Sequence, residues 1–167
     1  MLRMYKIDKI NRKLLEIIQN DGRSSNQDVA EKLNLSPSPC LQRRKYLEEK
    51  GVITGYSSQV DLKKIARHVF VWAEVTLKHN KVAEEKIFEK YLMDTDYIIK
   101  ALALGGKVDY LVLFCVPSVE FYQTATYTMM EETNIIKNLT SHFVMREVKK
   151  FEGFPLSLLL DAQDATP

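Results

Sequence analysis

Apolar residues in the first third of the chain recur at three- and four-residue spacing, which is the period of an amphipathic helix. The stretch "DKINRKLLEIIQND" places five aliphatic residues on one face, with Asp8 as a candidate N-cap and Gly22 as a candidate stop. The stretch "SSNQDVAEKLN" repeats the pattern in a shorter helix, in which Ser25 and Asp28 form a weak capping box. The pattern therefore predicts two helices joined by a short loop.

A third helix is predicted by "LSPSPCLQRRKYLEEKG". Ser36 suits the N-cap and Pro37 the first helical position, where a missing N–H costs nothing, and Gly51 ends the helix. The inward side is expected to carry Cys40, Leu41 and Leu47. The outer side and first turn then present the residues that we predict to contact DNA: Ser36, Ser38, Pro39, Gln42, Arg43, Lys45 and Tyr46.

A short helix, a tight turn and a capped helix with polar outer residues form the plan of a helix-turn-helix. The second helix of such a pair enters the major groove, where Gln42 suits adenine and Arg43 suits guanine or phosphate. A solvated cationic face on an ordinary three-helix bundle is the alternative interpretation. Residues 52–61 follow as a short β segment, either the wing or linker strand of a winged helix or a plain connector.

Beyond residue 67 the pattern changes to alternation, which indicates strands. "HVFVWAEVTL", "YIIKALAL", "YLVLFCV" and "IIKNLTSHFVMREVKK" predict four strands, and amphipathic helices are predicted after Asn80 and after Ser118. The order strand, helix, strand, strand, helix, strand is that of a ferredoxin-like βαββαβ unit. The fold class is therefore α+β, with a helix-turn-helix followed by a ferredoxin-like domain.

The two helices of such a unit cover only one face of the sheet. We expect large apolar residues on the other face, which would make it a natural interface between two copies. The alternative is that residues 151–167 fold back over that face, with "PLSLLL" as an added edge strand. The expected open face carries Phe70, Trp72, Tyr110, Val112, Phe114 and Val116, of which Phe70, Trp72, Val112 and Phe114 are the predicted dimer contacts.

The charge is divided unevenly along the chain. Residues 1–67 hold 14 Lys/Arg and 8 Asp/Glu, which gives a net charge of +6. Residues 68–167 hold 10 Lys/Arg and 14 Asp/Glu, which gives −4, so the whole chain has a net charge of +2. A basic head and an acidic remainder favour two domains with different partners, which we place at 1–61, with the linker strand, and 62–167. Chance variation over a solvated surface is the alternative.

Composition excludes several classes of protein. No apolar run reaches the roughly 18 residues of a membrane span, and the two cysteines, Cys40 and Cys115, lie far apart, which favours a reducing cytoplasm. The three histidines are scattered, so no metal site is expected. The sequence lacks a catalytic triad and a nucleotide-binding glycine motif, so we expect neither an enzyme nor a cofactor.

Taken together, "IDKINRKLLEIIQNDGR", "LSPSPCLQRRKYLEEKGVITGY", "GGKVDYLVLFCVPS" and "SHFVMREVKK" resemble the Lrp/AsnC family of transcriptional regulators over nearly the whole chain. The resemblance implies double-stranded DNA as a partner and dimers that assemble further, often into octameric rings. It also implies an amino acid or related small molecule as a non-covalent effector. The alternative function is an architectural protein that wraps DNA without sensing a ligand.

The resemblance further implies an effector site near the glycine loop between two dimers. Backbone N–H groups at Gly105 and Gly106 suit a carboxylate, and Asp109 suits an ammonium group. An ordinary strand-to-strand turn is the alternative interpretation of "GGKVD". The expected site comprises Leu104, Gly105, Gly106, Asp109, Tyr110, His142 and Val144.

The chain departs from the family pattern in places. Arg44 stands where the family usually has an aliphatic residue, and Tyr46 stands where it has a cation. We expect Arg44 to extend from the underside of its helix. Lys107 stands where the family usually has a small acidic or polar residue, and His142 stands where it often has an aromatic residue. We therefore do not assign the operator preference or the ligand of relatives to this chain.

Overall fold

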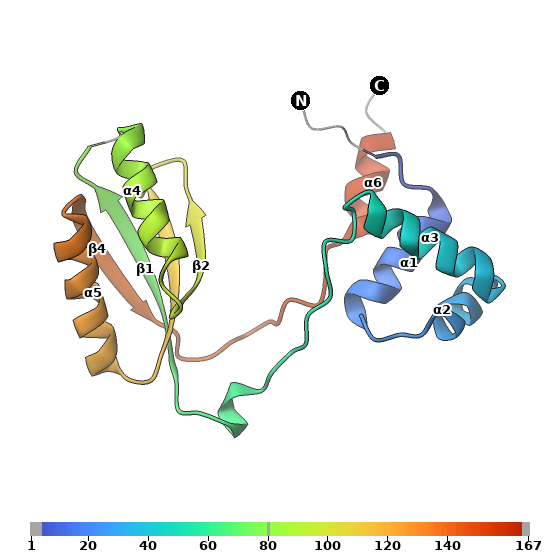
Figure 1. Cartoon of the computed structure of the whole chain (residues 1–167), viewed down its shortest axis with the longest axis horizontal. Coiled ribbons are helices and arrows are strands. Elements are labelled where there is room, and N and C mark those ends of the chain that lie inside the picture. The colour runs from blue at the N-terminus through green and yellow to red at the C-terminus, as the bar shows by residue number, and fades with distance from the viewer. Residues whose placement is uncertain (1–4, 80, 165–167) are drawn as a thin grey trace. The chain divides into compact units, whose positions relative to one another are not determined.

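The computed structural model describes residues 5–79 and 81–164, which divide into two units (Figure 1). The helical unit contains residues 5–59 together with 149–164, and the sheet unit contains residues 60–148. The described chain therefore leaves the helical unit, forms the sheet unit and returns.

Three helices make up the first part of the helical unit: α1 (Lys9–Asn20), α2 (Asn26–Leu33) and α3 (Pro37–Glu49). Their N-termini confirm the predicted caps. Asp8 accepts a hydrogen bond from the Asn11 backbone N–H, and Ser25 and Asp28 form a complete capping box. Ser36 occupies the N-cap of α3, with Pro37 next to it. Each of these caps is made by a residue next to the helix that it begins, so the signal is local in the sequence.

The C-terminal end of α3 is closed by Gly51, whose φ of 67° is in the left-handed region. Its N–H donates to the Glu48 carbonyl, while the Val52 N–H donates to the Leu47 carbonyl. This pair of bonds is the Schellman arrangement, and glycine adopts it without a steric penalty. The predicted helix end is therefore confirmed.

A small core joins the three helices, formed by Leu14, Ile18, Val29, Ala30, Cys40 and Leu47. The inward prediction for Leu41 is wrong, because this side chain is 37% exposed. Adjacent residues of a helix point about 100° apart, so Cys40 and Leu41 cannot both face the centre of the same core.

The C-terminal segment carries a correction. The predicted domain boundary places the segment with the ferredoxin-like domain of residues 62–167, but α6 (Leu156–Asp164) is a helix of the helical unit. Arg12 of α1 forms an ion pair with Asp161, and the Gln19 amide exchanges two hydrogen bonds with the Phe154 backbone, both 2.9 Å. Side chains of α1 therefore hold a segment about 140 positions away in sequence, which short-range patterns do not report.

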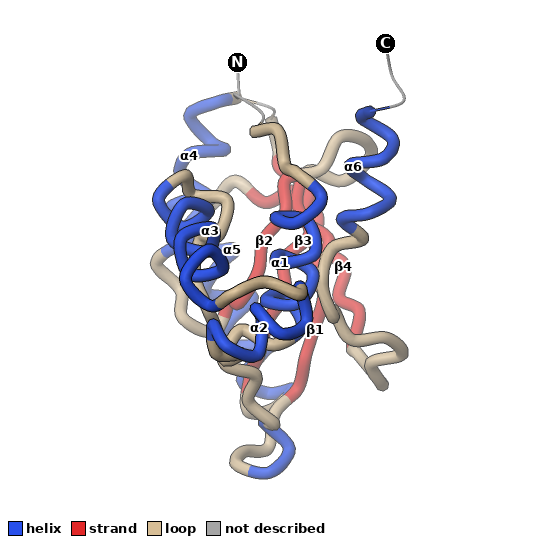
Figure 2. The backbone as a smooth tube through the Cα atoms, turned by 90° about the vertical axis from the view of Figure 1, so that its right-hand side faces the viewer, coloured by secondary structure: helices blue, strands red, loops and turns tan. Residues whose placement is uncertain are grey.

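The sheet unit confirms the βαββαβ order. Strands β1 (Val69–Leu77), β2 (Ile98–Ala103), β3 (Tyr110–Val116) and β4 (Ile136–Phe143) pair antiparallel in the order β2-β3-β1-β4 (Figure 2). Helices α4 (Val82–Met93) and α5 (Val119–Thr133) lie along one face of this layer (Figure 1). Strand β4 is shorter than predicted, because its pairing with β1 ends at Phe143.

The face of the sheet on which β3 residues lie is a second correction. Val112 lies opposite Ala73 and Phe114 opposite Val71, and all four side chains are fully buried on the helix-covered face. The predicted dimer contacts Val112 and Phe114, with Tyr110 and Val116, are therefore core residues. Phe70 and Trp72 remain on the open face, as predicted, beside the alternate β3 residues Leu111, Leu113 and Cys115.

The linker strand predicted over residues 52–61 is wrong for the described chain, which has no strand there. Val52 and Ile53 pack against the small helical core, and the one short element before β1 is η1 (Leu62–Lys64), which Asp61 caps. A strand needs a partner for its backbone groups, and within the described residues every paired strand belongs to the four-stranded sheet.

Candidate nucleic-acid interface and effector site

The outer surface of α3 presents most of the predicted DNA contacts to solvent. Six of the seven predicted residues are exposed, and among the described residues the Gln42 and Lys45 side chains make no hydrogen bond or ion pair with another residue. Unpartnered amide and ammonium groups on one helix face are free to meet base edges and phosphates. The exposed set is Ser36, Ser38, Pro39, Gln42, Lys45 and Tyr46.

The first turn of α3 offers few backbone donors. Pro37 and Pro39 have no N–H group, so Ser38 supplies the N–H between them, and the Ser36 hydroxyl makes no capping bond. A phosphate at this helix end would meet one N–H and two hydroxyl groups rather than a ring of backbone donors. The serines therefore replace donors that the prolines remove.

Arg43 is the predicted residue that the structure places differently. Its side chain is only 32% exposed, and its Nη1 lies 2.6 Å from Asp8 Oδ2 and 2.9 Å from Asn11 Oδ1. Burial alone raises the pKa of Asp8, but the Asn11 N–H and the Arg43 guanidinium outweigh it and lower that pKa below its ordinary value. Arg43 therefore ties α3 to the start of α1.

Arg44 extends to the underside of α3, as expected from its position. It reaches the carbonyls of Gly22 and Ser24 and the hydroxyl of Tyr56. Tyr56 was not among the predicted site residues. The sequence shows it only as a tyrosine within residues 52–61, and its partner Arg44 lies twelve positions earlier in the chain.

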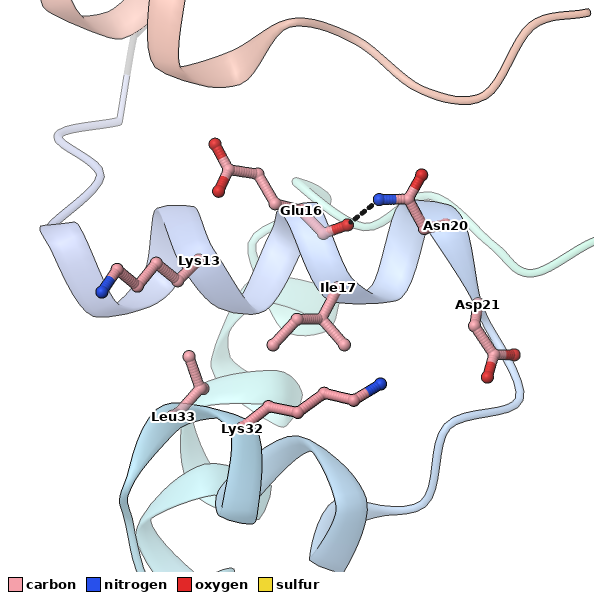
Figure 3. A pocket seen from close by; sticks show the side chains of 7 residues that line it. All are labelled: Lys13, Glu16, Ile17, Asn20, Asp21, Lys32 and Leu33. Atoms are coloured by element: carbon pink, nitrogen blue, oxygen red, sulfur yellow. Dashed lines mark hydrogen bonds between the residues drawn. The ribbon is translucent and has the colours of Figure 1, made fainter.

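A shallow hollow of about 490 Å³ lies between α1 and α2, with side chains of both charges around it (Figure 3). Its lining residues are Lys13, Glu16, Ile17, Asn20, Asp21, Lys32 and Leu33. The Asn20 amide donates to the Glu16 carbonyl and not into the hollow (Figure 3). No predicted DNA or effector residue lines it, so the expected chemistry lies elsewhere.

The turn between β2 and β3 is closed by a backbone hydrogen bond and contains the two glycines of the predicted effector site. Its ends are closed by the Leu104 N–H, 2.8 Å from the Asp109 carbonyl, while a φ of 142° at Gly106 favours glycine. Space beside both Gly105 and Gly106 is open, and in the described chain their N–H groups make no backbone hydrogen bond. The turn therefore presents free donors to solvent.

Asp109 has a structural role at this turn. Its Oδ2 accepts a hydrogen bond from the Leu77 N–H at 2.8 Å, and its own N–H donates to the Val75 carbonyl. The carboxylate thus fixes the end of β1 against the turn. Its other oxygen has no hydrogen-bond partner among the described residues, so it remains available to a cation.

The other predicted effector residues lie apart from the turn. Tyr110 is 5% exposed in the core, where its hydroxyl donates to Glu89 and burial first of all raises its pKa to about 12. His142 lies on the open face, opposite Trp72 and 3.3 Å from Glu74. Asp109 binds Leu77, five positions along β1 from Trp72, a separation of about 17 Å. A single copy of the chain therefore does not bring His142 and Asp109 together.

Val144 follows the end of β4, where its N–H donates to the Phe70 carbonyl. It lies with His142 at the end of the sheet opposite the glycine turn, since β1 runs from Phe70 toward Leu77. A pocket that used both ends would require surfaces from more than one copy of the chain.

The open face of the sheet has an apolar centre and charged surroundings. Trp72 and Phe70 lie next to Leu111, Leu113 and Cys115. Glu74 and Lys100 supply charged groups around them, and His142 supplies an imidazole. The described helices include none long and apolar enough to cross a membrane, and the described side chains include no group of three or more potential metal ligands.

Two family profiles match the chain. The profile of winged helix-turn-helix DNA-binding proteins matches residues 7–54, and that of the Lrp/AsnC ligand binding domain matches residues 69–154. The chain is 33% identical over 145 residues to the transcriptional regulatory protein DoeX of Halomonas elongata, covering 87% of this chain and 92% of that protein. It is 28% identical over 144 residues to the leucine-responsive regulatory protein of Escherichia coli, covering 86% and 88%.

Solved structures give the same result. A transcriptional regulator of Neisseria meningitidis in complex with L-Met superposes with a TM-score of 0.86 at 25% identity, covering 93% of this chain and 100% of that one. An AsnC family transcriptional regulator of Agrobacterium tumefaciens superposes with a TM-score of 0.84 at 28% identity, covering 92% and 99%. Both similarities extend over the helical and the sheet units.

Proposed function

The chain belongs to the Lrp/AsnC family of DNA-binding transcriptional regulators, which are not enzymes, and from that premise we propose that an amino acid controls its assembly or its affinity for DNA. The six exposed residues of α3 and its N-cap are the proposed DNA contacts. The turn at Gly105 and Gly106 receives the effector. The open face of the sheet joins two copies, and dimers join into a higher oligomer.

The single observation that carries the effector assignment is the pairing of free donors with a free carboxylate oxygen at one turn. A free amino acid has a carboxylate and an ammonium group a few ångströms apart. The unpartnered N–H groups of Gly105 and Gly106 suit the carboxylate of the ligand. The oxygen of Asp109 that does not bind Leu77 suits the ammonium group of the ligand. The Neisseria relative, solved with L-Met, supports an amino acid as the ligand class.

Dimerisation through the open face rests on its composition. Trp72 and Phe70 lie half-buried beside Leu111 and Leu113, on the face of the sheet opposite α4 and α5. Contiguous apolar surface of this kind is typical of an interface between proteins. Two copies joined there would bring two α3 helices into one assembly, as required for binding paired half-sites about one helical turn apart.

The effector assignment is tested by thermal unfolding of the full chain with each of the twenty amino acids. A ligand of the native state raises the melting temperature by mass action. We expect one or a few amino acids to do so, with light scattering reporting any change of oligomer. A flat response to all twenty would contradict the proposal and favour the ligand-independent, DNA-wrapping alternative.

Two substitutions at Asp109 separate charge from structure. Asp109→Asn keeps an oxygen for the Leu77 N–H but removes the charge, whereas Asp109→Ala removes both. We expect both variants to lose the response to the active amino acid. Only Asp109→Ala should melt at a lower temperature without ligand. An Asp109→Asn protein that still responds would show that this carboxylate does not bind the ammonium group.

A further inference from the structure

Tyr56 is the last residue of the helical unit that is fixed by side-chain contacts before the chain crosses to the sheet unit. Its hydroxyl accepts a hydrogen bond from Arg44 Nε at 2.8 Å and donates one to Glu48 Oε1 at 2.6 Å. The Arg44 guanidinium also lies over the Tyr56 ring, 4.8 Å from its centroid. The ring rests on Gly22, where an added Cβ would lie 3.2 Å from Tyr56 Cδ1.

Arg44 links this tyrosine to the remainder of the helix-turn-helix. Its side chain is 15% exposed, and its two terminal nitrogens lie 3.1 and 3.4 Å from the carbonyls of Ser24 and Gly22 in the loop between α1 and α2. One guanidinium therefore joins that loop, helix α3 and the start of the linker. The planar, multi-donor geometry of arginine permits this arrangement, which an aliphatic residue cannot make.

The contact shortens the unattached part of the linker. Ile53 packs on the helical core and Asp61 caps the next element, so residues 54–60 lie between these points. Seven extended residues reach about 24 Å, but with Tyr56 held only residues 57–60 are unattached, and these reach about 14 Å. Among the described residues, no side-chain hydrogen bond holds residues 57–60.

We propose that the Arg44–Tyr56 contact is a positioning latch, which fixes where the linker leaves the helix-turn-helix and thereby sets the half-site spacing that an oligomer accepts. The inference rests on the proposed function, since spacing has meaning only for two joined DNA-binding units. Neither residue faces the outer surface of α3, so the latch acts on geometry and not on the bases. Releasing it lets each DNA-binding unit reach a wider range of half-site positions.

The test is a selection of double-stranded DNA from a random-sequence pool by the full-length protein. The original chain and three variants, Arg44→Leu, Tyr56→Ala and Tyr56→Phe, are compared, with Tyr127→Ala as the control. Tyr127 is an exposed tyrosine of α5 whose side chain has no hydrogen-bond or ring partner within the described chain. Sequencing the bound DNA reports the half-site sequence and the distribution of half-site spacings.

We expect the original chain and the control to select one half-site sequence at one spacing. Tyr56→Ala and Arg44→Leu should select the same half-site, with the preference for the best spacing reduced roughly tenfold. Tyr56→Phe keeps the ring on Gly22 but loses both hydroxyl bonds, so it should have a smaller effect. The Arg44→Leu/Tyr56→Ala double variant should broaden the spacing no further than either single change, because both act on one contact.

Two results would overturn the latch. A variant that keeps the single spacing shows that the linker is positioned by other contacts, and a variant that changes the half-site sequence shows a role in base recognition. If the original chain selects no DNA at all, the proposed function fails together with the latch. Failure of the two ideas is therefore distinguishable.

Discussion

The two units of this chain are stabilised in different ways. Among the described residues, the core of the helical unit contains six buried residues, and polar ties such as Arg43 to Asp8 and Arg44 to Tyr56 supplement it. The described core of the sheet unit contains fourteen buried residues, in which Phe114 lies within ring contact of Tyr97 and Tyr122. One unit is specified by directed contacts between side chains and the other mainly by apolar burial.

This difference matches their tasks. The helical unit must present exposed polar groups to DNA, so a small core leaves most of each helix surface for other contacts. The sheet unit keeps its helix-covered face closed, and the opposite face is the one that we propose joins another copy. A substitution therefore has different consequences according to which unit, and which face, it alters.

The largest expected effect is a loss of stability that distinguishes the helix-covered face of the sheet from the open face. Phe114→Ala should lower the free energy of unfolding by about 3–5 kcal/mol, because it leaves a cavity beneath the helices. Trp72→Ala, on the open face, should cost less in unfolding but shift the assembly toward single copies. Chemical denaturation and size-exclusion chromatography with light scattering measure both. The reverse pattern would contradict the assignment of faces.

A smaller effect is expected at the outer surface of α3. Gln42→Ala should weaken binding to the selected DNA by about 1–3 kcal/mol if its amide reads a base, with no change in melting temperature, since it has no partner in the described chain. Gln123→Ala, an exposed glutamine of α5, is the matched control. Fluorescence anisotropy gives both affinities, and equal affinities would remove Gln42 from the interface.

Two serine caps provide a comparison within the helical unit. Ser25 accepts the capping bond of α2, whereas Ser36 of α3 makes none. Ser25→Ala should therefore cost about 1 kcal/mol of stability, and Ser36→Ala should change it by less than about 0.5 kcal/mol. Ser36→Ala should nevertheless weaken DNA binding. Equal losses of stability would mean that α3 is capped by the serine hydroxyl after all.

The smallest effect is the response of the helical unit to acid. Folding lowers the pKa of Asp8 below its ordinary value of 3.8, so its contribution is present above that pH and is lost as the pH falls through the folded pKa. Asp8→Asn should thus lower the melting temperature more at pH 6 than at pH 3. A difference that grows toward pH 3 would have the wrong sign for this contact.

Several elements could be predicted from the sequence because their signals are local. Asp8, Ser25 and Gly51 mark helix ends by chemistry that acts within a few residues. The order of strands and helices follows from the hydrophobic pattern, which alternates every second residue in strands and recurs at three- and four-residue spacing in helices. Exposure of Gln42 and Lys45 follows from their position on a capped amphipathic helix.

Other features could not be predicted because they depend on partners far along the chain. Strand β3, "YLVLFCV", is apolar at every position, so the sequence gives no polar residue to mark which side faces the helices. Only its register with β1 places Val112 and Phe114 in the core. The tie from Arg43 to Asp8 and the helical state of "PLSLLL" likewise depend on contacts with α1.

The contact of α6 with α1 has a practical consequence for anyone handling the protein. A fluorescent label on α6 would report on the helical unit, although α6 follows the sheet in sequence. A truncated version that stops at residue 59 would leave Arg12 and Gln19 without the groups that bind them. An isolated DNA-binding fragment is therefore best made by splicing residues 149–164 back onto it.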